Sequence, residues 1–191
     1  PYFYGYKTGG ILQNQQQADE YNSKYGEKAQ PGDVIFLDIA GEKSNTPDGK
    51  ITDADKTKIG KGMPDWTFGL SLGADWKGFD IRMFWQGTLK RDYFQGSYYF
   101  WGANGRQGPW FSTALKGHDD YFRNDEASPL GTNLNSYYPR PLFNTDKNQQ
   151  SQTKYLQDAS YLRLKNLQIG YSLPHNIVQK MGMQNLRIFA S

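Results

Sequence analysis

Two stretches of the chain, residues 66–76 and 79–89, alternate between apolar and polar or small residues. In the first stretch the intervening residues are Thr, Gly, Ser, Gly and Asp. Successive side chains of a β-strand point to opposite faces of a sheet, so this pattern predicts a strand with one continuous apolar face. The apolar positions of the first stretch are Trp66, Phe68, Leu70, Leu72, Ala74 and Trp76.

The two stretches predict a β-hairpin. With Lys77-Gly78 as a two-residue turn, Trp76 lies opposite Phe79, and counting outward places apolar residues opposite one another along one face. The further pairs are Ala74 with Ile81, Leu72 with Met83, Leu70 with Trp85, and Trp66 with Leu89. The other face is mostly polar or small. Two features fit it badly: Phe84 lies on the polar face, and Asp75 lies opposite Asp80.

The rest of the chain predicts fewer regular elements. Residues 160–173 read as a third clear strand, in which a bulge near Lys165-Asn166 reconciles two halves of opposite parity. We expect a weak strand at 1–12 and a polar loop, with at most a short helical turn, at 13–30. After the third strand we expect a connector with a short helix at 174–184 and the start of another strand at 185–191. The long connections at 13–65 and 90–159 are expected to be largely irregular.

The apolar face suits either a soluble sandwich or a membrane barrel, because both bury one face of a strand. Strand length and the positions of aromatic residues favour the membrane. Residues 66–76 extend ~33 Å at ~3.3 Å per residue, and a tilt of ~45° reduces this to ~23 Å, close to the ~25 Å apolar band of an outer-membrane barrel. Trp66 at one end, with Trp76 and Phe79 at the other, suits the aromatic girdles of such barrels. The predicted lipid-facing residues are Trp66, Phe68, Leu70, Leu72, Trp76, Phe79, Ile81, Met83 and Trp85.

Composition narrows the function classes. The 191 residues include 16% aromatic residues and 21 Gly, no Cys, and a net charge of +3, while the mean hydropathy is −0.82. Strands and turns suit this composition better than a helix bundle. The small charge gives no argument for nucleic acid, and the absence of Cys removes disulfides and thiol chemistry. The match to G-x-S-x-G at 69–73 lies within a predicted strand instead of a strand-to-helix turn, so it predicts no nucleophile.

Seven stretches in order resemble the C-terminal part of the SusC/RagA family of TonB-linked outer-membrane proteins. They are FYGYKTGGIL (3–12), QPGDVIFLD (30–38), DGKITDADKTKIG (48–60), MPDWTFGLSLGADWKGFDIRMFWQG (63–87), YPR (138–140), SYLRLKNLQIGYSLP (160–174) and MGMQNLRIFAS (181–191). The resemblance implies that residues 1–191 form an antiparallel transmembrane β-barrel segment with long extracellular loops, from which the plug and the last strands are missing.

The resemblance also implies a function. The whole protein would be an importer in the cell outer membrane, taking up oligosaccharides, or peptides, with a SusD-like surface lipoprotein. TonB would act through the N-terminal part that this segment lacks, and the segment would not be an enzyme. Two alternatives remain: a soluble carbohydrate-binding β-sandwich, and a TonB-dependent receptor for another cargo class such as metal chelates.

Residues 44–55 can be aligned with a calcium loop, because hard cations need several oxygen ligands from a tight turn. Gly49 takes the turn position. The loop departs from the DxNGDG run that the family often carries: an insertion separates Asp38 from Asp48, and Ser44 and Thr46 stand where acids are expected. The alternative is a solvated Asp/Gly turn. The candidate ligands are Asp48, Lys50 through its carbonyl, and Asp55.

Residues 91–130 concentrate aromatic residues among glycines. Exposed rings there could stack on sugar rings or contact a partner protein, or they could fold back and pack on one another as a compact loop. The sequence does not decide between these two arrangements. The residues expected to face a ligand or partner are Tyr98, Tyr99, Phe100, Trp101, Trp110 and Phe111.

Overall fold

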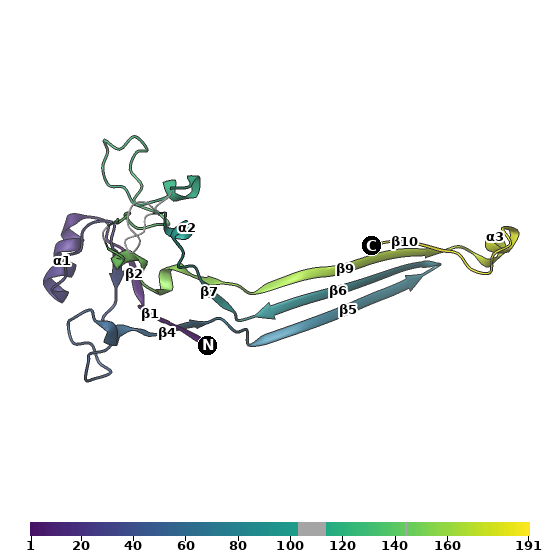
Figure 1. Ribbon diagram of the computed structural model, residues 1–191, viewed down its shortest axis with the longest axis horizontal. Helices are drawn as coiled ribbons and strands as arrows, with labels where there is room; N and C mark the ends of the chain where they lie inside the picture. The colour runs from purple at the N-terminus through teal and green to yellow at the C-terminus, as the bar shows by residue number, and fades with distance from the viewer. Residues whose placement is uncertain (103–113, 144) are drawn as a thin grey trace. The chain divides into compact units, whose positions relative to one another are not determined.

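The computed structural model describes residues 1–102, 114–143 and 145–191 (Figure 1). The chain divides into two compact units. Unit 1 consists of Pro1–Gly62 and Tyr93–Gln157, and unit 2 of Met63–Asp92 and Asp158–Ser191. None of the helices in the described ranges is long and apolar enough to cross a membrane.

Unit 2 is built on one antiparallel sheet of four strands: β5 (Trp66–Trp76), β6 (Phe79–Leu89), β9 (Tyr161–Ser172) and β10 (Arg187–Ala190). They lie in the order β10-β9-β6-β5 (Figure 1). The hairpin of β5 and β6 has the register that the sequence predicts, with Trp76 opposite Phe79 and Trp66 opposite Leu89. Lys77 and Gly78 both have positive φ, 48° and 87°, as the favoured tight hairpin turn requires.

The predicted third strand and its bulge are confirmed. In the pairing of β6 with β9, Phe84 lies opposite Asn166 while the next residue, Trp85, lies opposite Leu164. Lys165 is therefore the extra residue, and it returns Leu164 to the apolar face. The connector after β9 contains the short helix α3 (His175–Lys180), as expected, and the chain then forms β10.

Residues 1–12 form two short strands instead of one. β1 (Tyr2–Gly5) pairs with β4 (Thr57–Lys61), whereas β2 (Thr8–Ile11) pairs with β3 (Val34–Phe36). A third ladder joins β7 (Asp92–Phe94) to β8 (Leu156–Asp158). The first two ladders are antiparallel, and the strands of all three are short. Unit 1 therefore contains several small two-stranded sheets instead of one large sheet.

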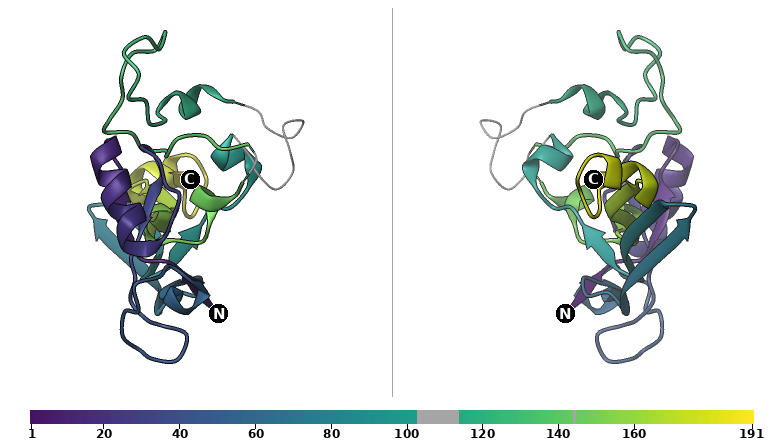
Figure 2. Two further views of the ribbon diagram at one scale, coloured as in Figure 1. Left: turned by 90° about the vertical axis from the view of Figure 1, so that its left-hand side faces the viewer. Right: turned by 90° about the vertical axis from the view of Figure 1, so that its right-hand side faces the viewer.

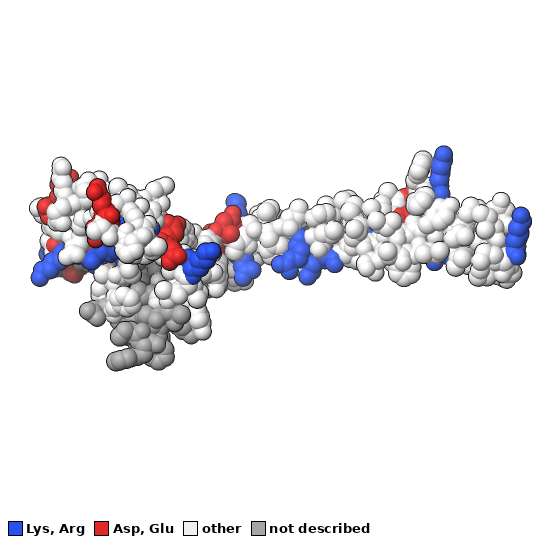
Figure 3. Space-filling view, turned by 90° about the horizontal axis from the view of Figure 1, so that it is seen from above, with Lys and Arg blue, Asp and Glu red and all other residues white. Residues whose placement is uncertain are grey.

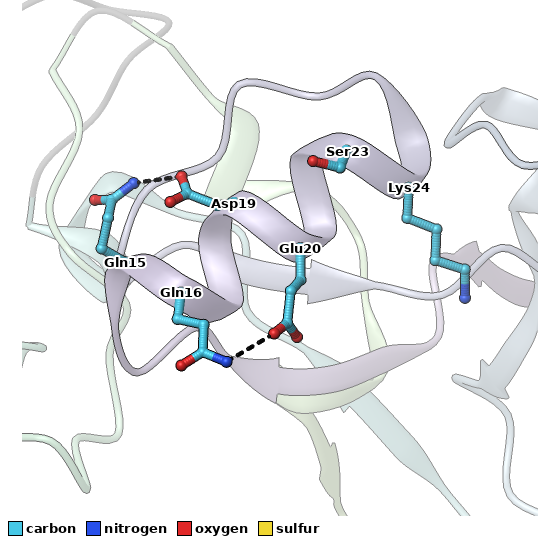
Figure 4. Close-up of a pocket in the computed structure, with 6 residues that line it drawn as sticks. All are labelled: Gln15, Gln16, Asp19, Glu20, Ser23 and Lys24. Atoms are coloured by element: carbon cyan, nitrogen blue, oxygen red, sulfur yellow. Dashed lines mark hydrogen bonds between the residues drawn. The ribbon is translucent and has the colours of Figure 1, made fainter.

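The expectation of a loop at 13–30 is wrong, because α1 (Gln15–Tyr25) is an 11-residue helix. The Asn14 side chain accepts a hydrogen bond from the Gln17 amide, and Gly26 ends the helix with φ 68°. Only Ala18 and Tyr21 are buried, so the apolar stripe was too narrow to show in the sequence pattern. The outer face carries hydrogen-bonded pairs four residues apart (Figure 4): Gln15 with Asp19, and Gln16 with Glu20.

The long connections that were expected to be irregular form, together with Tyr6, a core cluster of unit 1. The rings of Tyr6, Phe36, Phe100, Trp101 and Tyr155 pack in one buried cluster. The surrounding chain contains several short helices. The loop between β3 and the short helix at Asp53–Asp55 extends away from α1 (Figure 2). These helices are η1 (Asp53–Asp55), α2 (Tyr98–Trp101), η3 (Lys116–Asp119), η4 (Lys147–Gln149) and η5 (Thr153–Tyr155).

A buried polar network links the QPGDVIFLD stretch (30–38) to the YPR stretch (138–140). The Asp33 carboxylate is fully buried and accepts hydrogen bonds from Arg140, from the Asn148 amide and from the Gln30 backbone. Asn148 in turn accepts from the Val34 amide at 3.0 Å. The QPGDVIFLD and YPR stretches, far apart in sequence, are thus held together inside unit 1.

Candidate membrane interface and ligand sites

The apolar face predicted for the hairpin continues across the sheet of unit 2. Each row of paired residues on this face is apolar or glycine, and every row except that of Trp66 and Leu89 continues from β5 through β6 to β9. Two rows extend to β10, where Ile188 lies opposite Tyr171 and Ala190 opposite Ile169. The residues that β9 adds to the face are Leu162, Leu164, Leu167, Ile169 and Tyr171.

Large side chains of this face are exposed. Trp66 and Trp76, at the two ends of β5, are 66% and 68% exposed, and Phe68, Leu70 and Leu72 between them are also exposed. On β6, Phe79 is exposed, while Ile81, Met83 and Trp85 are partly buried by their neighbours. Uncharged residues cover most of the strand surface of unit 2 that is visible in Figure 3. A face of this size and composition is suited to contact with an apolar environment.

The opposite face contains charges, and four of them form two ion pairs. Asp75 and Asp80 lie opposite one another, as predicted. The resulting repulsion is relieved because Arg82 binds Asp75 through Nη2 at 2.8 Å, and Arg187 donates from Nε to Asp80 at 2.9 Å. The second pair lies over Gly170, where a Cβ would collide with both side chains. A glycine is therefore needed at this position so that Arg187 of β10 can reach Asp80 of β6.

The aromatic residues expected to face a ligand or partner have different environments. Tyr99 is 60% exposed, as such a role requires. Phe100 and Trp101 are instead buried in the core cluster of unit 1, so the expectation of an exposed position does not hold for these two rings. They meet Tyr155 edge to face, at centroid distances of 5.8 and 4.7 Å. Trp110, Phe111 and the side chain of Tyr98 lie outside what the structure describes.

The candidate calcium loop has a different local role for each of its acids. Asp55 is fully buried, and its carboxylate accepts hydrogen bonds from the amides of Ile39, Ala40 and Thr52 at 2.8, 3.1 and 2.8 Å. Asp48 is exposed and accepts from the Lys50 amide at 3.1 Å. Asp55 thus forms the capping box of η1 and anchors the preceding loop, a role that the sequence analysis missed. Among residues 1–102, 114–143 and 145–191, no three His, Cys, Asp or Glu side chains are placed to hold a metal ion together.

Two curated proteins of Formosa agariphila are similar to the chain along nearly its whole length. TonB-dependent receptor P3 is 31% identical over 189 residues, and TonB-dependent receptor P26 is 24% identical over 195 residues. These alignments cover 99% and 98% of the chain but 17% of each relative. The chain therefore spans about a sixth of the length of the curated relatives that it matches. No model of a protein family matches it.

Two solved structures share its fold. The RagAB peptide importer in the closed-closed state gives a TM-score of 0.57 at 20% identity, covering 100% of this chain and 19% of that chain. The same importer in the open-open state gives a TM-score of 0.52 at 21% identity, covering 98% of this chain and 18% of that chain. The open antiparallel sheet of unit 2 is accordingly a segment of a β-barrel wall. The chain is thus similar in sequence to a segment of two curated TonB-dependent receptors and in fold to a segment of the RagAB importer, and both findings support a SusC/RagA-like segment.

Proposed function

We propose that unit 2 is part of the transmembrane wall of an importer in the cell outer membrane, with its apolar face in lipid. The observation that carries this proposal is the continuous apolar face on the 11-residue strands β5 and β6. Strands of this length match the span of a tilted strand across a bilayer. Each residue of β6 pairs with a residue of β5, and all but Leu89 pair with a residue of β9 as well, as a strand inside a closed barrel wall requires. The aromatic side chains at both ends of β5 suit the two membrane–water interfaces.

The whole protein, in this proposal, is a TonB-dependent importer, and the segment lies toward the C-terminal end of its barrel. It takes up oligosaccharides or peptides together with a SusD-like surface lipoprotein, and TonB acts on parts outside these 191 residues. The likeness to TonB-dependent receptors and to the fold of a peptide importer supports this function. Nothing in it requires this segment to catalyse a reaction.

Two neighbouring positions on β5 test the orientation of the sheet. Leu72 lies on the apolar face opposite Met83, and Ser71 lies on the other face opposite Phe84, at nearly the same depth along the strand. The segment contains no Cys, so Leu72→Cys and Ser71→Cys each add one thiol to it. Each variant of the whole receptor, with any other cysteine replaced, would carry a nitroxide spin label in lipid vesicles.

We expect the label at position 72 to collide mainly with oxygen, which concentrates in lipid, and the label at position 71 to collide more with a water-soluble nickel chelate. If position 72 is open to the nickel chelate, or if neither label contacts lipid, the membrane-wall proposal is wrong. The soluble β-sandwich would predict the latter result, because its apolar face is covered by a second sheet.

The partner is tested separately. Affinity purification of the tagged whole receptor from its own outer membrane should yield a lipoprotein in equal amount. Recovery of the receptor alone, under mild detergent conditions that preserve its fold, would contradict the proposed SusD-like partner while leaving the orientation of the wall unaffected.

A further inference from the structure

One end of unit 2 combines the tight turn between β5 and β6 with the connector 173–186 between β9 and β10, which contains α3 (Figure 1). The Ser172 amide donates to the Gly78 carbonyl at 2.7 Å, and the Leu173 amide donates to the Leu186 carbonyl at 3.0 Å, so backbone hydrogen bonds join the turn to the start of the connector. Outer-membrane barrels have short turns on the periplasmic side and long loops outside. Under the proposed function this end therefore lies at the inner leaflet, which consists of glycerophospholipids.

The turn holds a cation beside a ring of the apolar face. Trp76 ends that face on β5, opposite Phe79, and is 68% exposed. The Nζ atom of Lys77 lies 5.0 Å from the centroid of the Trp76 ring. An ammonium group is thus placed where the apolar face ends, next to an indole N–H that can donate as well.

The connector adds a second set of apolar and cationic side chains. Ile177 and Met181 are 46% and 56% exposed, and their spacing of four residues places them on one side of the helical turn. Lys180, between them in the sequence, is exposed too, whereas Val178 is buried. Exposed apolar side chains beside a lysine are typical of segments that lie at a membrane surface, where the lysine stem follows the apolar region and its ammonium reaches the headgroups.

The charges at this end of unit 2 favour an anion. The connector 173–186 contains no Asp or Glu. Asp75 and Asp80, the acids that flank the turn in the sequence, are each already bound by an arginine. Neither Lys77 nor Lys180 forms an ion pair with any residue that the structure describes. Two exposed ammonium groups therefore remain for an anion from outside the segment.

We propose that this end of unit 2 binds the phosphate group of a glycerophospholipid headgroup through Lys77 and Lys180. The phosphate diester accepts charge-assisted hydrogen bonds from ammonium groups, and the acyl chains of the same lipid cover Trp76, Ile177 and Met181. A free phosphate ion would match the cations but would leave these apolar side chains exposed, so the combination favours the lipid. The proposal goes beyond the proposed function and rests on the lipid-facing orientation that the function assumes.

The experiment places a spin label beside the two lysines. Asn176 is an exposed polar residue of α3, and Asn176→Cys in the whole receptor, with any other cysteine replaced, would carry a nitroxide. The receptor would be freed of lipid, kept in dodecyl maltoside, which contains no phosphorus, and given a small molar excess of phosphatidylglycerol. Electron–nuclear double resonance then detects phosphorus-31 nuclei close to the nitroxide.

We expect a phosphorus signal from the label at position 176 and none from a label at position 72, in the middle of β5. Absence of the signal at position 176 would overturn the proposal. An equal signal with inorganic phosphate in place of the lipid would overturn it as well, because the site would then bind the ion alone.

Paired substitutions test the two lysines. Lys77→Gln with Lys180→Gln should lower the phosphorus signal at least threefold, because it removes both positive charges. The matched control is Lys28→Gln with Lys43→Gln, which removes two exposed lysines of unit 1 and should leave the signal unchanged. Equal signals from the two double variants would contradict the assignment of the phosphate to Lys77 and Lys180.

A conservative variant separates loss of the charges from damage to the turn. Lys77→Arg with Lys180→Arg keeps both cations and should keep the signal, and its loss would count against a site that recognises charge. Folded migration in gel electrophoresis would be checked for every variant. Failure of phosphate binding is distinct from failure of the proposed function, since the spin labels at positions 71 and 72 in vesicles report on lipid contact of the wall without these lysines.

Discussion

The ring of Phe84 covers the backbone of Gly69 on the neighbouring strand. A Cβ at position 69 would lie 3.0 Å from Cε2 of Phe84, so the ring occupies the space that a side chain there would need. Gly69 lies opposite Gln86, and Phe84 opposite Ser71, which makes the two diagonal neighbours. This explains an apolar residue on the polar face of the sheet: an aromatic ring restores the packing and shielding that a glycine within a strand lacks.

Phe84→Ala should therefore destabilise unit 2 although the side chain is partly exposed. We expect a loss of about 1 kcal/mol, the scale of a cross-strand aromatic contact. The measurement is the temperature at which the whole receptor in detergent loses its folded migration in gel electrophoresis. Phe84→Leu, which keeps part of the cover, should lie between wild type and Phe84→Ala. An unfolding temperature that does not change would show that the ring contributes nothing over Gly69.

The buried pair of Asp33 and Arg140 predicts a larger effect in unit 1. Arg140→Met leaves the fully buried Asp33 carboxylate without its cation, and we expect a loss of about 3–5 kcal/mol. Adding Asp33→Asn should recover part of this loss, because an amide is cheaper to bury than an unpaired charge. The free energy of unfolding of each variant would be measured by urea unfolding, with tryptophan fluorescence as the signal, since Trp101 lies in the core of the same unit. If the double variant is no more stable than Arg140→Met, the unpaired charge is not the cause.

The sequence predicted unit 2 far better than unit 1, for a physical reason. In a strand the side-chain period is two, so fixing the turn at Lys77-Gly78 fixes every cross-strand pair as far as Trp66, and the parity change in β9 locates the bulge. Unit 1 has no such period. Its rings meet across distant segments, as when Trp101 packs on Tyr155, and no local pattern encodes that contact.

The helix α1 was missed for a different reason. Asn14 and Gly26 are recognisable capping residues, and they were available in the sequence. The 11 residues between them bury only two side chains, so the periodic apolar signal was almost absent. The contact of Tyr21 on this helix with Phe36 was not predictable either, because the Tyr21 hydroxyl donates to the Phe36 carbonyl from a separate segment of unit 1.

The buried tyrosines predict a loss of stability at alkaline pH. Burial, together with the hydrogen bond to Asp53, raises the pKa of Tyr6 to about 12 from an ordinary value of 10.0. Below pH 10 the phenol is neutral in both folded and unfolded chains, and the full stability is present. As the pH rises from 10 to 12, only the unfolded chain loses the proton, so the free energy of unfolding falls.

The measurement is urea unfolding of the whole receptor at several pH values between 9 and 12. In Tyr6→Phe the decrease with pH should be shallower but still present, since burial also raises the pKa of Tyr21 and Tyr155. Tyr99→Phe, at an exposed position, is the control and should reproduce the wild-type decrease. A wild-type stability that stays constant across this range would contradict the prediction.

The two acids of the candidate calcium loop should respond differently to substitution. Asp55→Ala leaves three backbone amides without their acceptor in a buried position, so we expect a loss of about 3 kcal/mol or more. This loss should be the same with calcium and with a chelator, because the amides bind the carboxylate directly. Asp48→Ala, on an exposed acid, should change the stability by less than about 0.5 kcal/mol in the chelator.

Calcium then separates a metal site from a solvated turn. If the loop binds calcium, millimolar calcium raises the unfolding temperature of wild type, and Asp48→Ala removes that increase because it removes one oxygen ligand. The Asp38 carboxylate accepts hydrogen bonds from the amides of Asp48 and Gly49, at 3.2 and 2.7 Å, and so already closes this turn without a metal. An unfolding temperature that is indifferent to calcium would show that these hydrogen bonds are sufficient, and that the acids of the loop serve its folding alone.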